Sequence, residues 1–416
     1  MIHCLHPFLS EWPHCATRPV KLQVTNSAIA SLHRGHPWLY AERIKEESHQ
    51  GQAGDLAVVF DTKKRFVAVG LYDPHSRIRM RVLRASKPGP IDRDFFAERI
   101  AQALARRLPL LKTKTDGYRM IFGESDGLPG MVIDRYADTA VVKLYTHIWL
   151  PHLYDCLDIL LEQHPLERIV LRLSRGMRQP PESLRGLADG QIIYGEPIRE
   201  TLTCLENGLR FEVDPIRGQK TGFFLDQRDN RARVEKLARG RRVLNVFSYN
   251  GGFSLAAARG GATEVTSIDQ SGSALESSQR NFVLNAGVAA IAAAKHLTIE
   301  DDAFKALTEL VKKGEKYGLV IIDPPAFAVR RSQVKAALNA YGRLAHLGVS
   351  LLAPGGDIVL ASCSSPVSIE DYRQVVCVAA ERAGRPLREI SETAHPLDHP
   401  LDFADSRYLK CLFAKA

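Results

Sequence analysis

The segment VLNVFSYNGGFSLAAARGG (243–261) decides the fold class of this chain. Its apolar start, 243–247, has the length and composition of a buried strand, and a helical segment follows. Between them lie Gly251 and Gly252, which let the backbone approach a ligand at the N–H groups of the helix N-terminus. The glycines do not form the G-x-G-x-x-G pattern, which weakens the case for a nicotinamide dinucleotide. The segment predicts the strand, turn and helix of an α/β domain.

Strands and helices alternate throughout the region 206–416 that contains this segment. Further strands are expected at EVTSID (264–269), YGLVIID (317–323) and GDIVLAS (356–362). Helical patterns separate them, and these are SGSALESSQRNFVLNAG (271–287), the second part of LTIEDDAFKALTELVKK (297–313) and VKAALNAYGRLAHLGVSLL (334–352). Alternation of this kind predicts a doubly wound parallel sheet, with ligands at the carboxyl ends of its strands.

Acidic residues stand where two of these strands end. Asp269 is placed to accept hydrogen bonds from ribose hydroxyls, and a role as the cap of the following helix is equally compatible with its position. Asp302 ends the third strand region, where a carboxylate suits an adenine amino group, and Asp301 is an equally good occupant of that place. A glycine turn followed by one acidic residue is by itself a weak indication of a nucleoside-binding site.

The next two strands are followed by a more specific arrangement. In DPPAF (323–327) two prolines remove backbone donors and stiffen the loop, which leaves the carboxylate of Asp323 facing the crevice. Cys363 ends the neighbouring strand, so we expect it beside this loop. An isolated cysteine at a strand end is usually a buried structural thiol, whereas its position beside Asp323 favours a reactive one.

The first part of the chain is predicted to be a small β-barrel with a helical start. Its short apolar runs, separated by turn residues, are LAVVF (56–60), RFVAVGLY (65–72) and RIRMRVL (77–83). In the last run Arg77, Arg79 and Arg81 alternate with apolar residues, which places the three guanidinium groups on one face. Such a row suits a phosphate backbone, and a solvated strand face is the equal alternative.

A stretch rich in Pro, Gly and Asp near 85–92 marks a linker. An amphipathic helix, DFFAERIAQALARRLPLL (94–111), and several strands follow it. We therefore expect four parts, which are an N-terminal extension at 1–20, a β-barrel at 21–88, a small α/β middle domain at 89–205 and the doubly wound domain at 206–416.

One match in the middle domain imitates a hydrolase. GESDG (123–127) fits the G-x-S-x-G pattern of a nucleophile elbow, which requires a strand, a sharp turn and then a helix. Here Leu128-Pro129-Gly130 and another strand follow. The segment therefore predicts a β-hairpin loop rather than a catalytic Ser125.

Composition excludes a disordered tail protein, a collagen-like fibre and a disulfide scaffold. With 56 Lys+Arg against 47 Asp+Glu, 45% hydrophobic and 25% charged residues, the chain resembles ordinary soluble globular proteins. Its net charge of +9 favours a polyanionic partner. Seven cysteines without framework spacing predict reduced thiols in a cytoplasmic protein, and no apolar run is long enough for a membrane span. We expect no metal site, because no common ligand spacing is formed by His3, Cys4, His6, His14 and Cys15.

Taken together, several motifs make the chain resemble the RlmI-like family of 23S ribosomal RNA (cytosine-C5)-methyltransferases. They are KTGFFLDQR (220–228), VLNVFSYNGGFS (243–254), DPPAF (323–327) and ASCSS (361–365). The resemblance covers most of the chain. RGHPWLY (34–40) and DPHSRIRMRVL (73–83) look like the family's RNA-binding PUA domain, FGESDGLPGMVIDRY (122–136) looks like its middle domain, and the rest looks like its Rossmann-like catalytic domain.

The resemblance implies S-adenosylmethionine as the methyl donor and C5 of a cytosine in 23S ribosomal RNA as the acceptor, in a cytoplasmic enzyme for which a homodimer is possible. The cofactor-binding residues that it implies are Phe224, Asp226 and Arg228 around the pocket, Tyr249, Gly251 and Gly252 at the methionine part, Asp269 at the ribose, Asp302 at the adenine and Asp323 at the border with the target base.

The implied chemistry is consistent with Cys363 as the nucleophile. C5 of cytosine is a poor nucleophile, and addition of a thiolate to C6 turns C5 into an enamine-like carbon that can take a methyl group. Asp323 would orient the base at its amino edge. The target base must leave its stack to reach such a site.

The chain departs from another branch of RNA cytosine-C5 methyltransferases, which has a second cysteine in the Asp-Pro-Pro loop. Ala326 and Phe327 follow the prolines here. The segment HPLDHP (395–400) offers candidates for assisting release, and a turn that supports the pocket is at least as compatible with it.

Several rival functions remain open. Methylation of a base nitrogen fits the aromatic Phe327 after the prolines and needs no thiol. A non-catalytic RNA-binding protein that keeps the cofactor as a structural ligand would bind without turnover. A dehydrogenase is more distant because the glycine pattern differs, and a P-loop NTPase is more distant still because Gly218-Gln219-Lys220-Thr221 lacks the Gly-Lys pair.

Overall fold

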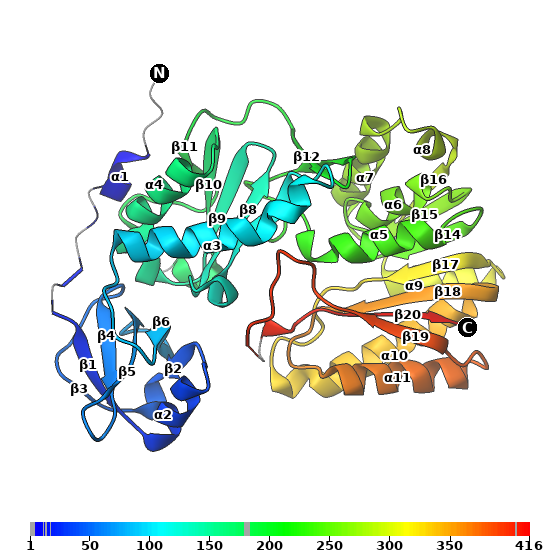
Figure 1. Cartoon of the computed structure of the whole chain (residues 1–416). Coiled ribbons are helices and arrows are strands. Elements are labelled where there is room, and N and C mark those ends of the chain that lie inside the picture. Colours follow the sequence, from blue (N-terminus) through cyan, green and yellow to red (C-terminus); the bar gives the residue numbers. More distant parts are fainter. Residues whose placement is uncertain (1–4, 11, 13–14, 17, 179–183, 404–405) are drawn as a thin grey trace. The chain divides into compact units, whose positions relative to one another are not determined.

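A computed structural model describes residues 5–10, 12, 15–16, 18–178, 184–403 and 406–416 (Figure 1). The chain forms two compact units. The first unit comprises Met1–Cys204, Val213–Leu225 and Leu397–Ala404, and the second comprises Leu205–Glu212, Asp226–Pro396 and Asp405–Ala416. Two segments of the predicted domain 206–416 thus pack with the N-terminal part of the chain.

The first unit begins with the expected barrel-like sheet. A short helix, α1 (Pro7–Ser10), precedes it, and α2 (Asn26–His33) is capped by the side chain of Thr25. The six strands, in the order β2-β6-β5-β4-β1-β3, are β1 (Val20–Val24), β2 (Trp38–Tyr40), β3 (Ile44–Glu47), β4 (Leu56–Phe60), β5 (Phe66–Tyr72) and β6 (Ile78–Ala85). The parallel pair β1–β4 joins strands that are otherwise paired antiparallel.

The middle part of the first unit is an α/β layer. Asp92 caps α3 (Arg93–Leu111) by accepting a hydrogen bond from the Phe95 backbone N–H at 3.0 Å. The five-stranded sheet has the order β11-β10-β9-β8-β7, and its elements are β7 (Gly117–Phe122), β8 (Met131–Tyr136), β9 (Thr139–Leu144), α4 (Leu153–Gln163), β10 (Arg168–Leu173) and β11 (Gln191–Tyr194). Both helices bury apolar side chains in one core with the sheet.

The second unit has the predicted doubly wound architecture. A β-hairpin, β12 (Leu202–Glu206) and β13 (Leu209–Val213), leads into it. Its helices are α5 (Arg228–Leu237), α6 (Gly252–Arg259), α7 (Gly272–Leu284), α8 (Ala289–Ala293), α9 (Ala303–Lys312), α10 (Val334–Ser350) and α11 (Ile369–Arg382). Its strands are β14 (Arg242–Val246), β15 (Glu264–Asp269), β16 (Lys295–Glu300), β17 (Tyr317–Ile322), β18 (Leu352–Ser362), β19 (Arg388–Thr393) and β20 (Lys410–Lys415).

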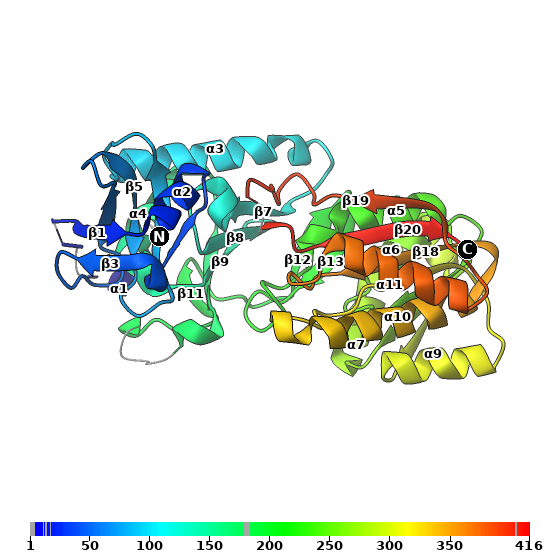
Figure 2. The same cartoon turned by 90° about the horizontal axis from the view of Figure 1, so that it is seen from below.

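The sheet of the second unit sets the place of its ligand site. Its strand order is β16-β15-β14-β17-β18-β20-β19, and the first five strands are parallel. At the end of the sheet, β20 pairs antiparallel with β18, and β19 pairs antiparallel with β20. Figures 1 and 2 show α10 and α11 side by side along this part of the sheet, where their buried residues form a core with β17, β18 and β20. The chain order reverses beside β14, which is the switch point at which ligands bind in such sheets.

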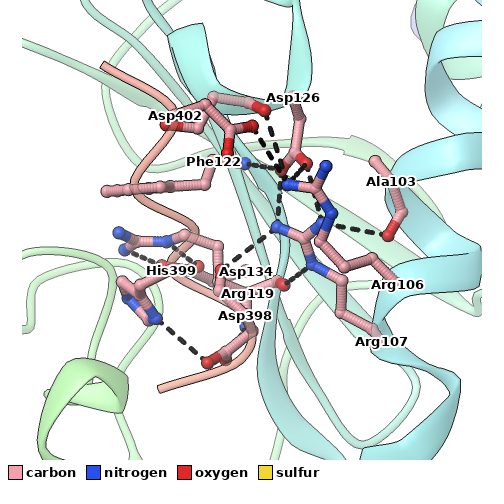
Figure 3. A network of polar contacts seen from close by, with 11 residues as sticks. Ala103, Arg106, Arg107, Arg119, Phe122, Asp126, Asp134, Asp398, His399 and Asp402 are labelled. Atoms are coloured by element: carbon pink, nitrogen blue, oxygen red, sulfur yellow. Dashed lines mark hydrogen bonds and ion pairs between the residues drawn. The ribbon is translucent and has the colours of Figure 1, made fainter. Parts of the chain in front are cut away.

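A buried ion pair ties α3 to the loop after β7. Arg107, which is 1% exposed, donates to both carboxylate oxygens of Asp126 at 2.8 and 2.5 Å (Figure 3). The same guanidinium donates to the Asp398 carbonyl at 3.1 Å, and the Asp398 carboxylate accepts from the Arg119 backbone N–H at 2.9 Å. This network holds the segment Leu397–Ala404 in the first unit.

We expect Asp126→Ala to destabilise the first unit by about 3–5 kcal/mol, because the Arg107 guanidinium loses the charge partner of a buried pair. All three tryptophans, Trp12, Trp38 and Trp149, belong to this unit, so tryptophan fluorescence during urea unfolding reports on it. Arg93→Ala is the matched control. It removes the exposed pairs with Asp158 and Glu162, which are worth about 1 kcal/mol or less. Equal midpoints for the two variants would contradict this role of Asp126.

Candidate active site

The turn between β14 and α6 has a strained backbone. Phe247 and Tyr249 have φ angles of 61° and 48°, a left-handed region that residues other than glycine rarely occupy. Ser248 in between donates its backbone N–H to the Ile268 carbonyl at 2.9 Å, which fixes the turn to the end of β15. Strain of this kind persists where the surrounding structure imposes it, and it concentrates at ligand sites.

Gly251 forms the N-terminal boundary of α6 without any side-chain cap. Its φ is 79°, and a Cβ atom at this position would lie 2.0 Å from the Ser278 hydroxyl oxygen. A glycine is therefore required by both backbone conformation and space. The uncapped N–H groups of the first helical turn are available to an anionic ligand group such as a carboxylate.

Asp269 holds the same turn from the end of β15. One carboxylate oxygen accepts a hydrogen bond from the Tyr249 backbone N–H at 2.8 Å, and the other accepts from the Ser271 N–H at 3.0 Å. The cap of α7 is Ser271, whose side chain accepts from Ala274, so the alternative reading of Asp269 as the helix cap is wrong. Each oxygen retains a second acceptor position, and the residue is half-buried.

The structure gives Asp302 a capping position. Its carboxylate accepts from the Lys305 backbone N–H at 3.1 Å and caps α9, and the residue is exposed. Asp301 donates its backbone N–H to the Asp269 carbonyl at 3.2 Å, which brings this loop beside Asp269. The predicted contact of Asp302 with an adenine stays a prediction.

The structure brings the Asp-Pro-Pro loop and Cys363 together, as the order of the strands predicts. β17 ends one residue before Asp323, and β18 ends one residue before Cys363. The Cys363 thiol lies 3.9 Å from the Pro324 carbonyl oxygen. Asp323 and Cys363 are both half-buried. A thiol and a carboxylate thus stand on neighbouring loops at one end of the sheet.

A buried hydroxyl network supports these two loops. The Tyr341 hydroxyl on α10 lies 2.8 Å from both the Ser362 and the Ser364 hydroxyls, one on each side of Cys363. Ser364 also accepts from the Ala328 backbone N–H at 3.0 Å, which joins the loop after β18 to the loop after β17. Burial raises the pKa of Tyr341, so its phenol stays neutral. This network was not predicted from the sequence, because nothing in it marks a helix tyrosine as a partner of the ASCSS segment.

Lys410 on β20 is the second residue that the sequence analysis missed. It pairs with Ser362 in the antiparallel register and is 4% exposed. Its ammonium group donates to the Ser364 carbonyl at 2.8 Å and to the Tyr408 carbonyl at 3.0 Å. Burial lowers its pKa to about 8. A lysine in the otherwise apolar run LKCLFA (409–414) was the available signal.

The three residues predicted around the cofactor pocket divide between the units. Phe224 belongs to the first unit, where the Lys220 ammonium lies 4.5 Å above its ring. Asp226 and Arg228 belong to the second unit and are buried. The Asp226 carboxylate accepts a hydrogen bond from the Tyr408 hydroxyl at 2.6 Å, which ties the loop before α5 to the chain before β20.

Of the predicted arginine row, Arg79 and Arg81 lie on β6, and Arg77 directly precedes this strand. The three side chains differ in their surroundings. Arg77 has a largely exposed side chain (81%) and a 3.3 Å pair with Glu42. Arg79 donates to the backbone carbonyls of Asp73 and Pro74. Arg81 is mostly buried and donates to Glu124 at 2.9 Å. A uniformly solvated row is wrong for Arg79 and Arg81, both of which are half-buried. The binding of RNA by this row stays a prediction.

The GESDG segment is a hairpin loop, as predicted. It forms a 3-10 turn, Gly123–Asp126, between the antiparallel strands β7 and β8. Ser125 is 6% exposed. Glu124 accepts from the Trp38 indole at 2.8 Å and from Arg81, and Asp126 pairs with Arg107. The segment joins the barrel to the middle sheet.

Of the five His and Cys residues considered for a metal site, the structure describes His6 and Cys15. His3, Cys4 and His14 lie outside the described residues. Among the described residues, no group of three or more His, Cys, Asp or Glu side chains could hold a metal ion. Within the same part of the chain, no helix has the length and apolar character needed to cross a membrane.

Two family models match the chain. One, described as S-adenosylmethionine-dependent methyltransferase, covers residues 181–407, which is more than half of the chain. The other, a PUA-like domain, covers residues 22–85. The first contains the whole β14–β18 region, and the second coincides with the six-stranded sheet.

Curated relatives match along nearly the whole length. A ribosomal RNA large subunit methyltransferase from Deinococcus radiodurans is 47% identical, and the match covers 96% of this chain and 98% of the relative. A ribosomal RNA large subunit methyltransferase I from Tolumonas auensis is 36% identical, with 93% and 96% covered. One from Aeromonas salmonicida is also 36% identical, with the same coverage.

Solved structures share the fold. A SAM-dependent methyltransferase structure from Streptococcus mutans has a TM-score of 0.78 at 21% identity, covering 95% of this chain and 100% of that one. A methyltransferase structure complexed with SAH has the same TM-score and coverage at 22% identity. At these identities the likeness supports the architecture alone.

The residues present fit the cofactor named by the family model. The uncapped N-terminus of α6 suits its carboxylate, and Asp269 has acceptor positions for ribose hydroxyls. These features lie at the carboxyl ends of two neighbouring strands, β14 and β15. They are compatible with the cofactor that the family model names.

We expect Gly251→Ala to weaken binding of S-adenosylhomocysteine at least tenfold, because the new Cβ clashes with Ser278 and strains a left-handed backbone. Isothermal titration calorimetry measures the affinity. Gly287→Ala is the matched control, since nothing lies within 4 Å of its Cβ position. Unchanged affinity in a folded Gly251→Ala protein would place the cofactor elsewhere.

Proposed function

The chain belongs to the family of S-adenosylmethionine-dependent methyltransferases, and from this premise we propose that it methylates C5 of a cytosine in 23S ribosomal RNA. The contact of the Cys363 thiol with the Asp-Pro-Pro loop carries the proposal. The names of the curated relatives support ribosomal RNA of the large subunit as the substrate class. The net charge of +9 supports a polyanionic substrate.

S-adenosylmethionine supplies, when bound, a methyl group on a positively charged sulfur. The α6 N-terminus and Asp269 are the groups of this chain that hold it in the proposal. Asp323, on the neighbouring loop, takes the place between this ligand and the target base. The pocket residues Phe224, Asp226, Arg228, Tyr249, Gly252 and Asp302 are proposed to complete the cofactor site.

Cys363 is the proposed nucleophile. Its thiolate forms a bond with C6 of the cytosine, and the electron pair of the C5–C6 double bond moves to C5. The C5 carbon would use that pair to form a bond with the methyl group, and the electron pair of the broken sulfur–methyl bond would stay on the sulfur of the donor, which leaves as a neutral thioether. Loss of the C5 proton to a base returns an electron pair, which restores the double bond and expels the thiolate. Covalent catalysis divides one difficult step into easier ones.

Asp323 and Phe327 are proposed to orient the base. The Asp323 carboxylate can accept a hydrogen bond from the cytosine amino group. Phe327 lies on the same loop and is half-buried, with its ring centroid 5.1 Å from that of Tyr341. The base must be unstacked or flipped to reach these side chains, at a cost of a few kcal/mol.

The Asp-His-Pro segment supports the structure rather than the chemistry. Asp398 and His399 are 0% and 1% exposed, and they are 3.0 Å apart in the first unit. The His399 ring packs 5.1 Å from the Phe122 ring. These contacts favour the interpretation of the segment as a structural turn.

We expect tritium from methyl-labelled S-adenosylmethionine to appear in 5-methylcytidine after incubation with unmodified 23S ribosomal RNA and digestion to nucleosides. Cys363→Ala should abolish this label, because no other thiol replaces the nucleophile. Cys377→Ala, on α11, is the control that should retain it. Label in another nucleoside, or label that survives in Cys363→Ala, would favour methylation of a base nitrogen. Binding of cofactor and RNA without label would favour a non-catalytic binding protein.

The exposed Arg77 is the member of the predicted row that we propose for a phosphate contact. We expect Arg77→Ala to weaken RNA binding and to reduce the slope of log affinity against log salt by about 1. Fluorescence anisotropy at several salt concentrations measures both. Arg65→Ala is the control, because Arg65 is also exposed and pairs with Asp61 in a turn. Identical salt slopes for Arg77→Ala and the unaltered protein would remove Arg77 from the RNA interface.

A further inference from the structure

Lys410 is a buried cation beside the proposed nucleophile. It begins β20, directly opposite Ser362 on β18, and Cys363 is the next residue along the chain from Ser362. Its side chain is on the same face of β20 as Leu412 and Ala414, which pack into the core with α10 and α11. Lysine is rarely buried to this extent unless its charge is compensated.

The hydrogen bonds of Lys410 leave its charge without a counter-ion at rest. Its ammonium group donates to the carbonyl oxygens of Ser364 and Tyr408, which are neutral groups. In the part of the chain that the structure describes, no carboxylate forms an ion pair with it. An unpaired buried charge costs several kcal/mol. The buried ammonium group therefore becomes stabilising only when a negative charge develops close to it.

The group that develops a negative charge there is the Cys363 thiol. Burial lowers the pKa of Lys410 to about 8, and the negative charge of ionised Cys363 opposes that lowering. The coupling is reciprocal, so the ammonium group favours the thiolate to the same extent. The hydrogen bond to the Ser364 carbonyl joins the ammonium group to the residue that directly follows Cys363.

Among the described residues around this pair, two phenols, a second thiol and the Asp323 carboxylate are titratable groups that carry no positive charge. Burial raises the pKa of Tyr341 on α10 and of Tyr372 on α11, so both phenols stay neutral. Burial, and secondarily the charge of Asp323, raises the pKa of Cys411, which faces the other side of β20. Arg233 lies 4.1 Å over the Phe413 ring on that other side. The His395 ring lies near the start of β20, where its Nε2 accepts a hydrogen bond from the Leu409 backbone N–H at 3.2 Å.

We propose that Lys410 is a positioning residue whose ammonium group holds Cys363 as a thiolate, ready to add to the base. The inference rests on the proposed role of Cys363 as nucleophile. When the Cys363 thiol ionises, its proton passes to solvent and the Lys410 ammonium group balances the charge that remains. The same ammonium group stabilises the thiolate again when elimination from C6 releases it. Lys410 touches neither substrate nor cofactor in this role.

Alkylation of Cys363 by iodoacetamide at a series of pH values tests the proposal, because only the thiolate reacts. The full-length protein is used without RNA, and peptide mass spectrometry follows the Cys363 peptide separately from those of the other cysteines. In Lys410→Gln, a neutral variant that retains an N–H donor for the Ser364 carbonyl, the midpoint pH of alkylation should rise by about one unit or more. Lys410→Arg, which retains the charge, should restore a midpoint near that of the unaltered protein.

Lys415→Gln is the matched control, since Lys415 stands on the same strand, is exposed and pairs with Glu389. Its midpoint should equal that of the unaltered protein. Thermal unfolding checks that each variant is folded. An unchanged midpoint in folded Lys410→Gln would overturn the proposal, and so would an equal rise in Lys415→Gln.

The test is independent of the proposed function because it measures thiol reactivity without methyl transfer. A Cys363→Ala protein that still methylates RNA would remove the covalent step and leave the Lys410–Cys363 coupling to be decided by alkylation. A raised alkylation midpoint in Lys410→Gln, together with methyl transfer by this variant that falls at neutral pH and recovers at higher pH, supports both the role of Lys410 and the role of Cys363 as nucleophile.

Discussion

The parallel pairing of β17 with β18 is the constraint on which the candidate active site depends. It places Ile322 opposite Leu360, so that Asp323 and Cys363 leave the sheet at the same end. The contact between the Cys363 thiol and the Pro324 carbonyl follows from that register. The hydroxyl of Tyr341, bonded to Ser362 and Ser364, holds the end of β18, and the hydrogen bond from the Ala328 backbone N–H to Ser364 joins this end to the loop after β17.

The first unit shows how segments far apart in the sequence are held by buried charge. Asp134, which is fully buried, accepts from Arg119 at 2.7 Å and from the Thr221 hydroxyl at 2.5 Å. Thr221 precedes the motif FFLDQR (223–228), so the middle sheet fixes the start of a segment proposed to bind the cofactor. Arg107 and Asp126 secure Leu397–Ala404 in the same unit. Thr221 and Asp398 both lie in the sequence region 206–416 that was predicted to be one domain. Their contacts, however, are with residues of the first unit.

Much of the architecture was predictable because local patterns determine it. The alternating strands and helices after residue 206, the hairpin at GESDG and the meeting of Cys363 with the Asp-Pro-Pro loop follow from period, turn residues and the rule for parallel strand ends. The surroundings of Arg79 and Arg81 were not predictable. Arg79 contacts backbone carbonyls and pairs with Glu47 at 3.6 Å, and the partner of Arg81 is a glutamate 43 residues away. Lys410 was missed for a related reason: a charged residue in an apolar strand gains meaning only when its neighbour across the sheet is known.

The central claim is that Cys363 forms a covalent bond with its target base, and one measurement tests it most directly. The protein is incubated with S-adenosylmethionine and 23S ribosomal RNA in which 5-fluorocytidine replaces cytidine. Fluorine cannot leave C5 as a cation, so elimination is blocked and the adduct accumulates. The account predicts that mass spectrometry after digestion finds a nucleotide attached to the peptide that contains Cys363. Active protein that methylates ordinary RNA but forms no such adduct at Cys363 would contradict it.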